Sequence, residues 1–207
     1  PLTLITEAVF ARALSARKQE RATASALYAN TTKPIAVERE RAIAAIHDAL
    51  YAAKIISYAQ GFMLMRQAAA DFEWPLNYGA VALMWRGGCI IRSRFLDNIK
   101  SAYDQSPELE NLLLDDFFKG EILQAVDGWR DALQMAISSG IPVPAMSSAL
   151  AFFDGYCSGV LPANLIQAQR DYFGAHTYER TDRERGERFH TDWAGLNGSA
   201  ISGAYDA

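Results

Sequence analysis

Two side chains suited to binding an anion lie close together near the end of the chain. Arg170 and His176 belong to the stretch Leu161 to His176, LPANLIQAQRDYFGAH, in which Arg170 falls in the last turn of a predicted helix. A guanidinium offers several donors, and an imidazole changes its charge near neutral pH. We therefore expect both residues to take part in the chemistry of this chain. The simpler alternative is a capped helix end followed by a surface histidine, because the helix dipole alone favours a cation there.

A third candidate, Arg12, lies on an otherwise apolar helix face. It falls in the middle of the face formed by Ile5, Ala8, Val9 and Ala16. A guanidinium on such a face must be paired or must reach a solvated pocket, since an unpaired buried charge is costly. The structural alternatives are that Arg12 forms an internal salt bridge with a carboxylate or that its side chain extends to solvent.

The adjacent acidic residues Asp115 and Asp116 are the one pair that invites a metal or acid/base interpretation. They precede an amphipathic helix, and carboxylates in a first turn are favoured by the helix dipole. No His or Cys lies nearby in the sequence to complete a set of metal ligands. We therefore predict a capping role and no metal site.

The composition and net charge of the chain limit the kinds of molecule that it is expected to bind. The 207 residues carry a formal net charge of −4, which gives no overall attraction for nucleic acid or an anionic membrane, so an anion must be recognised by a local cluster of basic residues. Cys89 and Cys157 lack redox or zinc spacing, as expected for reduced thiols in a cytoplasmic protein. The most apolar stretch, residues 42–65, is interrupted by polar residues, so we predict no membrane span and see no signal peptide.

The segments that carry these side chains all have the sequence pattern of helices. This pattern predicts an all-α, bundle-like fold. The stretch from Val37 to Phe72 has no proline and is rich in alanine, as in a helix at the centre of a bundle or in a subunit interface. Further helices are expected from Thr3 onward, over Tyr78–Trp85, Cys89–Tyr103, after Asp116, over Ala145–Ser158 and over Asn164–Phe173.

The two ends of the chain differ from the helical middle. Pro1 runs directly into a helical pattern, so we expect the chain to be a piece of something longer. Gly174 stands where a left-handed cap is common. After Glu179 the sequence becomes highly charged and loses its apolar face, and we interpret it as an arm that docks on a partner subunit or frays. Phe189 and Trp193 are its predicted anchors.

Several segments together resemble the C-terminal half of the 6-phosphogluconate dehydrogenase family. They are RGGCIIRS (86–93), NLLLDDFF (111–118) and LPANLIQAQRDYFGAHTYERTD (161–182), with TLITEAVFARALS at the start and RFHTDW at 188–193. The resemblance runs in the family's order from Pro1 to Trp193. It implies a large helical, dimer-forming domain over residues 1–176 and a tail, residues 177–207, that each subunit exchanges with its partner in a homodimer.

The resemblance also implies an activity. The family oxidises 6-phosphogluconate and releases CO2 to give ribulose 5-phosphate in the pentose phosphate pathway, with NADP bound by an N-terminal dinucleotide-binding domain. Residues that match Arg12 and, from the neighbouring subunit, Arg170 grip the substrate phosphate, and a residue that matches His176 hydrogen-bonds the substrate. We accordingly predict substrate-binding residues at these three positions.

No catalytic or cofactor-binding residue is predicted within the chain. The family's glycine-rich cofactor loop and its catalytic lysine and glutamate lie upstream of the matching region, so we expect these 207 residues alone to be inactive. One alternative is a non-catalytic helical dimerisation module. Another is a related hydroxyacid dehydrogenase that acts on a different acid.

Overall fold

The computed structural model describes residues 2–29, 34–193, 195 and 200–202. Contacts within the chain group into two units, residues 1–154 and 155–207. The turn that Asn30, Thr31, Thr32 and Pro34 predict between the first helices and the long one falls largely on residues 30–33, outside the described residues, as does most of the run of small residues 194–207. The predicted division between residues 176 and 177 stays a prediction.

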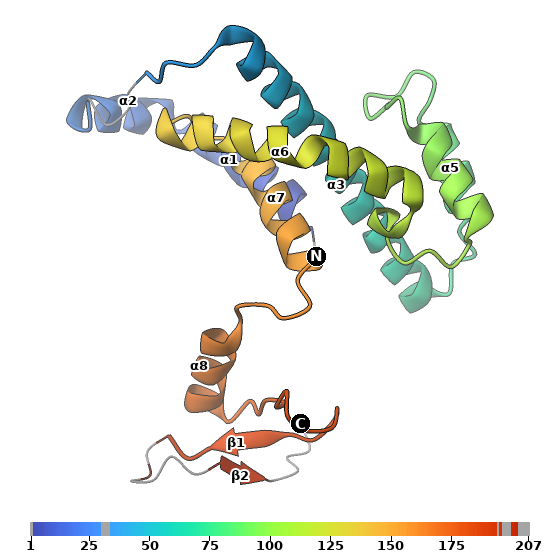
Figure 1. Cartoon of the computed structure of the whole chain (residues 1–207), viewed down its shortest axis with the longest axis vertical. Helices are drawn as coiled ribbons and strands as arrows, with labels where there is room; N and C mark the ends of the chain where they lie inside the picture. The colour runs from blue at the N-terminus through green and yellow to red at the C-terminus, as the bar shows by residue number, and fades with distance from the viewer. Residues whose placement is uncertain (1, 30–33, 194, 196–199, 203–207) are drawn as a thin grey trace. The chain divides into compact units, whose positions relative to one another are not determined.

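The all-α class is confirmed (Figure 1). Among the described residues, no helix combines the length and the apolar character needed to cross a membrane. The helices are α1 (Thr3–Ala16), α2 (Lys18–Leu27), α3 (Arg39–Phe72), α4 (Tyr78–Met84), α5 (Leu96–Gln105), α6 (Asp116–Ser138), α7 (Pro144–Tyr156) and α8 (Asn164–Gly174), with a 3-10 turn, η1, at Leu112–Leu114.

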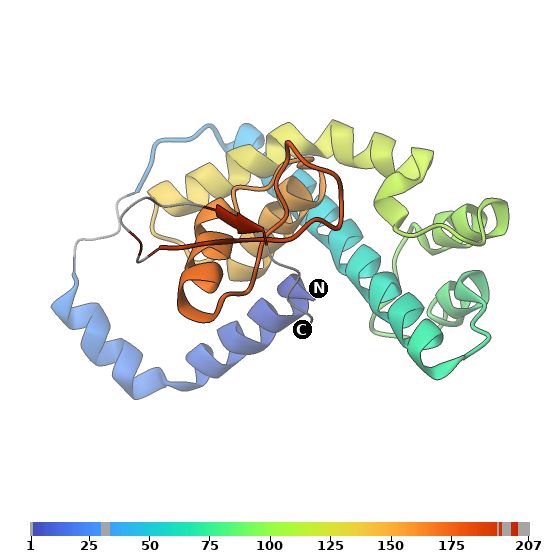
Figure 2. The ribbon, with the colours of Figure 1, turned by 90° about the horizontal axis from the view of Figure 1, so that it is seen from below.

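Helices α3 and α6 form the centre of the first unit, where they pack against each other and cross in both views (Figures 1 and 2). Alanines such as Ala49 and Ala52 on α3 are fully buried, as is Trp129 on α6. Small side chains on one helix allow a close approach and leave room for bulky ones on the other. The long alanine-rich segment is therefore the central helix that its composition predicted.

Carboxylates cap the N-termini of both central helices. The Glu38 side chain accepts hydrogen bonds from the backbone N–H groups of Glu40 and Arg41, at 2.8 and 2.7 Å. The Asp115 side chain accepts from those of Phe117 and Phe118, at 3.0 and 3.3 Å. These bonds satisfy donors that a helix leaves unpaired at its first turn. The capping interpretation of Asp115 is thereby confirmed.

The segment before α5 differs from the prediction of a helix over Cys89–Tyr103, which was wrong at its N-terminal end. Residues 89–95 form turns and irregular structure, and helix begins only at Leu96. Gly88 has a left-handed backbone (φ 71°), which turns the chain out of the helical path. The Lys54 ammonium donates to the Arg92 carbonyl at 3.2 Å, and this bond holds the segment against α3.

In the second unit, α8 lies beside a short antiparallel ribbon made of β1 (Phe189–Thr191) and β2 (Ala200–Ser202) (Figure 1). Phe189 also exchanges two backbone hydrogen bonds of 2.8 Å with Tyr178. Strands of three residues are too short to produce the alternating pattern by which strands are recognised in a sequence. The ribbon is therefore an addition to the predicted all-helical fold with an extended arm.

Candidate functional site

Arg170 and His176 line the same hollow at the C-terminal end of α8, together with Phe173 and Gly174. The hollow measures about 430 Å³ and is open to solvent, and the Arg170 side chain is exposed. The structure thus brings together the two residues that the sequence singled out in this stretch. A guanidinium and an imidazole on one open surface form a site suited to an anion such as phosphate.

The chain turns at the end of α8 through Ala175, not through Gly174. Ala175 has the left-handed backbone (φ 50°), so the prediction that Gly174 takes that conformation was wrong. Gly174 instead ends the helix under the His176 ring. A Cβ atom at Gly174 would lie 3.1 Å from Cδ2 of His176, closer than ordinary van der Waals contact. The glycine therefore provides the space in which the ring rests.

Gln167, one turn before Arg170, forms hydrogen bonds both to Arg170 and to the backbone that follows α8. Its amide nitrogen donates to the carbonyl oxygens of His176 and Thr177, at 2.9 and 2.6 Å. Its amide oxygen accepts from Nη1 of Arg170 at 3.4 Å. Gln167 was not among the candidates that the sequence indicated, although its position three residues before Arg170 places both on one helix face.

Asp171 fastens the tail to α8. Its fully buried carboxylate accepts hydrogen bonds from Nδ1 of His190 (2.9 Å), the backbone N–H of Thr191 (2.9 Å) and the indole N–H of Trp193 (2.8 Å). Burial alone would raise the pKa of Asp171, but the hydrogen bonds from these three donors outweigh burial and lower it. Trp193 therefore anchors the tail to α8 of its own chain, and the docking of the tail on a partner subunit stays a prediction.

Arg12 belongs to the first unit, where it lines a different hollow of about 580 Å³ between α1 and α3. The walls are largely apolar and include Val9 and Tyr58, and Lys54 supplies a second cation. The volume lies within the range that suits small ligands, and the two positive side chains favour an anionic one. Arg12 therefore faces a pocket, one of the two options that its position on an apolar face left open.

Lys54 was visible in the sequence only as one polar residue on the long helix. Its approach to Arg12 depends on how α1 lies against α3. The backbone N–H of Leu4 donates to Oε1 of Gln60 at 3.1 Å, and Nε2 of Gln60 donates to the Thr3 hydroxyl at 2.9 Å. These bonds place the start of α1 beside the middle of α3, and no local pattern in the sequence indicates this pairing.

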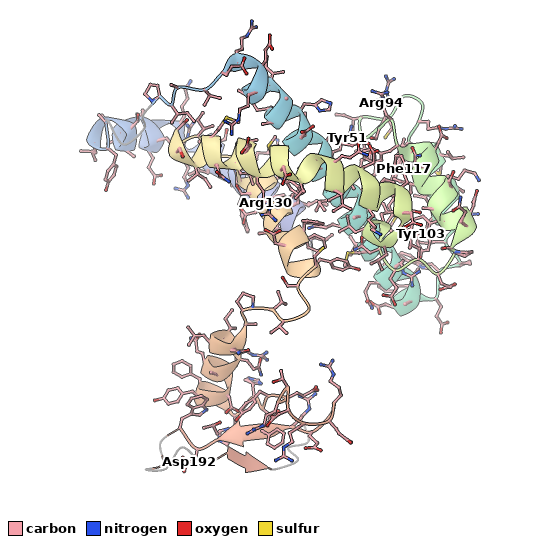
Figure 3. All side chains as sticks on the ribbon, viewed as in Figure 1. Tyr51, Arg94, Tyr103, Phe117, Arg130 and Asp192 are labelled. Carbon is pink, nitrogen blue, oxygen red and sulfur yellow. The ribbon has the colours of Figure 1, made fainter. Side chains whose placement is uncertain are left out.

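A further hollow in the first unit has titratable side chains from α3, α6 and the segment before α5 among its lining. Tyr51, Arg94 and Phe117, which are labelled in Figure 3, line it, and Glu121 adds a carboxylate. The Tyr51 hydroxyl donates to the Glu121 carboxylate. Burial, assisted by this hydrogen bond, raises the pKa of Tyr51 to about 12, so the phenol stays protonated at neutral pH. The pair connects α3 to α6 and offers no nucleophile.

The three predicted site residues are thus divided between the two units, with Arg12 in the first and Arg170 and His176 in the second. Among the described residues, no group of three or more His, Cys, Asp or Glu side chains is placed to hold a metal ion. The positive side chains in the hollow of Arg170 and in that of Arg12 are arginine, lysine and histidine, which makes each hollow suited to an anion.

The chain is similar to proteins of one family. A family model described as "6-phosphogluconate dehydrogenase, C-terminal domain" matches residues 1–193. The decarboxylating 6-phosphogluconate dehydrogenases of Haemophilus influenzae and Drosophila melanogaster are 56% and 58% identical over 206 and 208 residues, which cover all of this chain and 43% of each relative. The chain therefore spans less than half the length of these curated relatives.

A solved structure is also similar. It is that of Plasmodium falciparum 6-phosphogluconate dehydrogenase, described in its apo form, with its cofactor NADP+ and with its substrate 6-phosphogluconate. It superposes with a TM-score of 0.85 at 42% identity, over 93% of this chain and 41% of that one.

Proposed function

The chain belongs to the 6-phosphogluconate dehydrogenase C-terminal domain family, and from this premise we propose that it forms the substrate-binding and dimer-forming part of an NADP-dependent, decarboxylating 6-phosphogluconate dehydrogenase. The observation that carries the proposal is the joint position of Arg170 and His176 on one hollow. The reaction is the oxidative decarboxylation of 6-phosphogluconate to ribulose 5-phosphate in the pentose phosphate pathway of the cytoplasm.

In this proposal Arg12, Arg170 and His176 bind the substrate, and the two arginines hold its phosphate. A guanidinium forms charge-assisted, paired hydrogen bonds with phosphate oxygens, and these are stronger than bonds between neutral groups. His176 donates to a further oxygen of the substrate. Lys54 adds positive charge beside Arg12. The chain's own residues therefore bind and orient the substrate without taking part in hydride transfer.

The proposed assembly is a homodimer in which the second unit of each subunit, α8 together with the tail, docks on the other subunit and brings Arg170 and His176 to the partner's copy of Arg12. Exposed apolar side chains support a partner surface: Val9, Phe10 and Leu14 on α1 are 60, 61 and 59% exposed. Such a concentration of apolar surface on one short helix is characteristic of interfaces. On α8, Leu165 and Phe173 are similarly exposed, at 82 and 76%.

Hydride transfer requires NADP, which we assign to an N-terminal dinucleotide-binding domain outside these residues. The 207 residues contain no G-x-G-x-x-G motif. NADP supplies the hydride acceptor when it is bound. We therefore expect the 207-residue chain to show no turnover by itself, and the full-length protein to be active.

The experiment that tests the proposal is Arg170→Ala in the full-length protein. Loss of charge-assisted bonds to phosphate should raise the KM for 6-phosphogluconate by at least about tenfold, because each such bond contributes roughly 1.5–3 kcal/mol. The KM for NADP should change little. Arg185→Ala is the matched control, since the Arg185 side chain is 97% exposed and makes only a 3.5 Å ion pair with Glu179. An unchanged KM for 6-phosphogluconate in Arg170→Ala would refute the assignment.

A further inference from the structure

The Gln167 side chain contacts two of the proposed substrate-binding residues, Arg170 and His176. It is half-buried on α8 and does not line the hollow beside Arg170 and His176. Its hydrogen bonds are instead to the backbone that follows the helix and to Nη1 of Arg170. It can therefore affect a ligand in the hollow only through its neighbours.

The orientation of the Gln167 amide follows from the chemistry of its partners. The carbonyls of His176 and Thr177 only accept hydrogen bonds, so the amide NH2 must face them. The amide oxygen is then directed to Arg170, which only donates. Each atom of the amide thus meets a partner of the opposite kind, and a flipped amide would place like atoms together. The side chain is held in one orientation without any contribution from a ligand.

The two carbonyl bonds determine where the chain runs after α8. The left-handed Ala175 reverses the direction of the chain, and the buried Thr177 follows two residues later. The short bonds from Gln167 to residues 176 and 177 fasten this returning segment to the side of the helix. The His176 ring is thereby kept beside Gly174, at the edge of the hollow that Arg170 lines.

The contact with Arg170 is long, at 3.4 Å, and involves only Nη1. It is the one hydrogen bond of this guanidinium within the described part of the chain. Such a contact restricts the arginine side chain while leaving its other donors available. An arginine that is already oriented loses less conformational freedom when it binds a ligand.

We propose that Gln167 is a positioning residue that holds Arg170 and His176 in a single arrangement for the substrate. This inference rests on the proposed function. It differs from a purely structural role in a measurable way, because positioning affects the binding of a phosphorylated ligand more than it affects folding or the binding of NADP.

The test uses Gln167→Met and Gln167→Glu in the full-length enzyme. Methionine keeps the length of the side chain and removes all three hydrogen bonds. We expect the KM for 6-phosphogluconate to rise about tenfold, with kcat and the KM for NADP nearly unchanged and only a small fall in Tm from the bonds that the two carbonyls lose. Glutamate should weaken substrate binding at least as much, because its carboxylate repels both carbonyls and competes with phosphate for Arg170. Gln124→Met, at an exposed position on α6, is the matched control.

The same variants in an Arg170→Ala background separate this inference from the proposed function. If Gln167 acts partly through Arg170, the effect of Gln167→Met on KM should be much smaller once Arg170 is removed. If Arg170→Ala weakens substrate binding but both Gln167 variants behave as the native enzyme, the positioning role is wrong and the proposed function stands. If Arg170→Ala itself leaves the KM unchanged, the proposed function fails. A fall in Tm with an unchanged KM would show a structural role only.

Discussion

Gly174 is the residue at which the geometry of the hollow depends most directly on the absence of a side chain. A Cβ atom there would lie 3.1 Å from Cδ2 and 3.4 Å from Nε2 of His176. Gly174→Ala should displace the ring by a few tenths of an ångström and raise the KM for 6-phosphogluconate on the order of threefold to tenfold, less than the roughly hundredfold that a displacement of about 1 Å can cause.

Gly174→Ala should at the same time raise the free energy of unfolding, because alanine favours a helix over glycine by about 0.5–1 kcal/mol. Steady-state kinetics together with thermal unfolding of the full-length protein measure both effects. Gly159→Ala, at a position with open space around it, is the control in the same unit. A native KM in Gly174→Ala would show that the ring position has no effect on binding.

At the residue scale, type and helix position were sufficient to select Arg12, Arg170 and His176 as candidates. Their roles as substrate ligands stay predictions, but Arg170 and His176 share a hollow and Arg12 faces another. Gln167 was not predictable in the same way. Its bonds reach the carbonyls of a segment that returns only because Ala175 adopts a left-handed backbone, and alanine carries no sequence signal for that conformation.

At the scale of elements, the contact between α3 and α6 depends on Gly128. A Cβ atom there would lie 2.4 Å from Oδ2 and 2.9 Å from Cβ of Asp48 on α3. Gly128→Ala should therefore destabilise the protein by about 1–2 kcal/mol, since overpacking costs about 1–3 kcal/mol and improved helix propensity offsets part of it. Denaturant unfolding of the full-length protein measures the change.

Gly120 on the same helix provides the comparison for Gly128. Nothing lies within 4 Å of a Cβ atom placed there, so Gly120→Ala should stabilise the protein by about 0.5–1 kcal/mol. Opposite signs for the two variants would identify the close approach of the helices as the cause. Equal stabilisation would mean that α3 and α6 lie further apart than the structure shows.

The bond between α8 and the tail should depend on pH through Asp171. Because its pKa is lower in the folded protein, the carboxylate contributes stability that is complete above its ordinary pKa of about 3.9 and is lost as pH falls through the lower folded value. The Trp193 indole signal in NMR spectra should therefore stay in its bound position down to about pH 4 and shift only below it.

Asp171→Asn is the control for this titration. An amide cannot accept all three hydrogen bonds, so the tail should already be loosened at neutral pH, by at least about 2 kcal/mol, and the transition below pH 4 should disappear. A native Trp193 signal in Asp171→Asn would contradict the anchoring role.

Elements with strong local signals were predictable from the sequence, and those set by distant contacts were not. The central helix and the Asp115 cap follow from alanine content and first-turn carboxylates. The irregular segment before α5 could not be predicted in this way. Its apolar residues are spaced as in a helix, but the bond from Lys54 and the left-handed backbone of Gly88 keep the segment irregular. The ribbon formed by β1 and β2 depends on Asp171, which lies on a helix.

For the whole molecule, the two units are expected to function as parts of different sites in the proposed dimer. Arg12 belongs to the first unit and Arg170 to the second. In a symmetric dimer with exchanged tails, each site combines Arg12 of one subunit with Arg170 of the other. This arrangement can be tested by mixing subunits that carry different defects.

Arg12→Ala and Arg170→Ala subunits, each nearly inactive at low substrate concentration, should regain activity when they are dissociated together and reassembled. In a mixed dimer with exchanged tails, one site contains both alanines and the other contains both native arginines. Random reassembly should restore about a quarter of the native activity, because about half of the dimers are mixed and each has one intact site. If Arg12 and Arg170 instead serve a site within one subunit, every site in the mixture lacks one arginine. No recovery in dimers shown to be mixed by mass spectrometry would then exclude the exchange of tails.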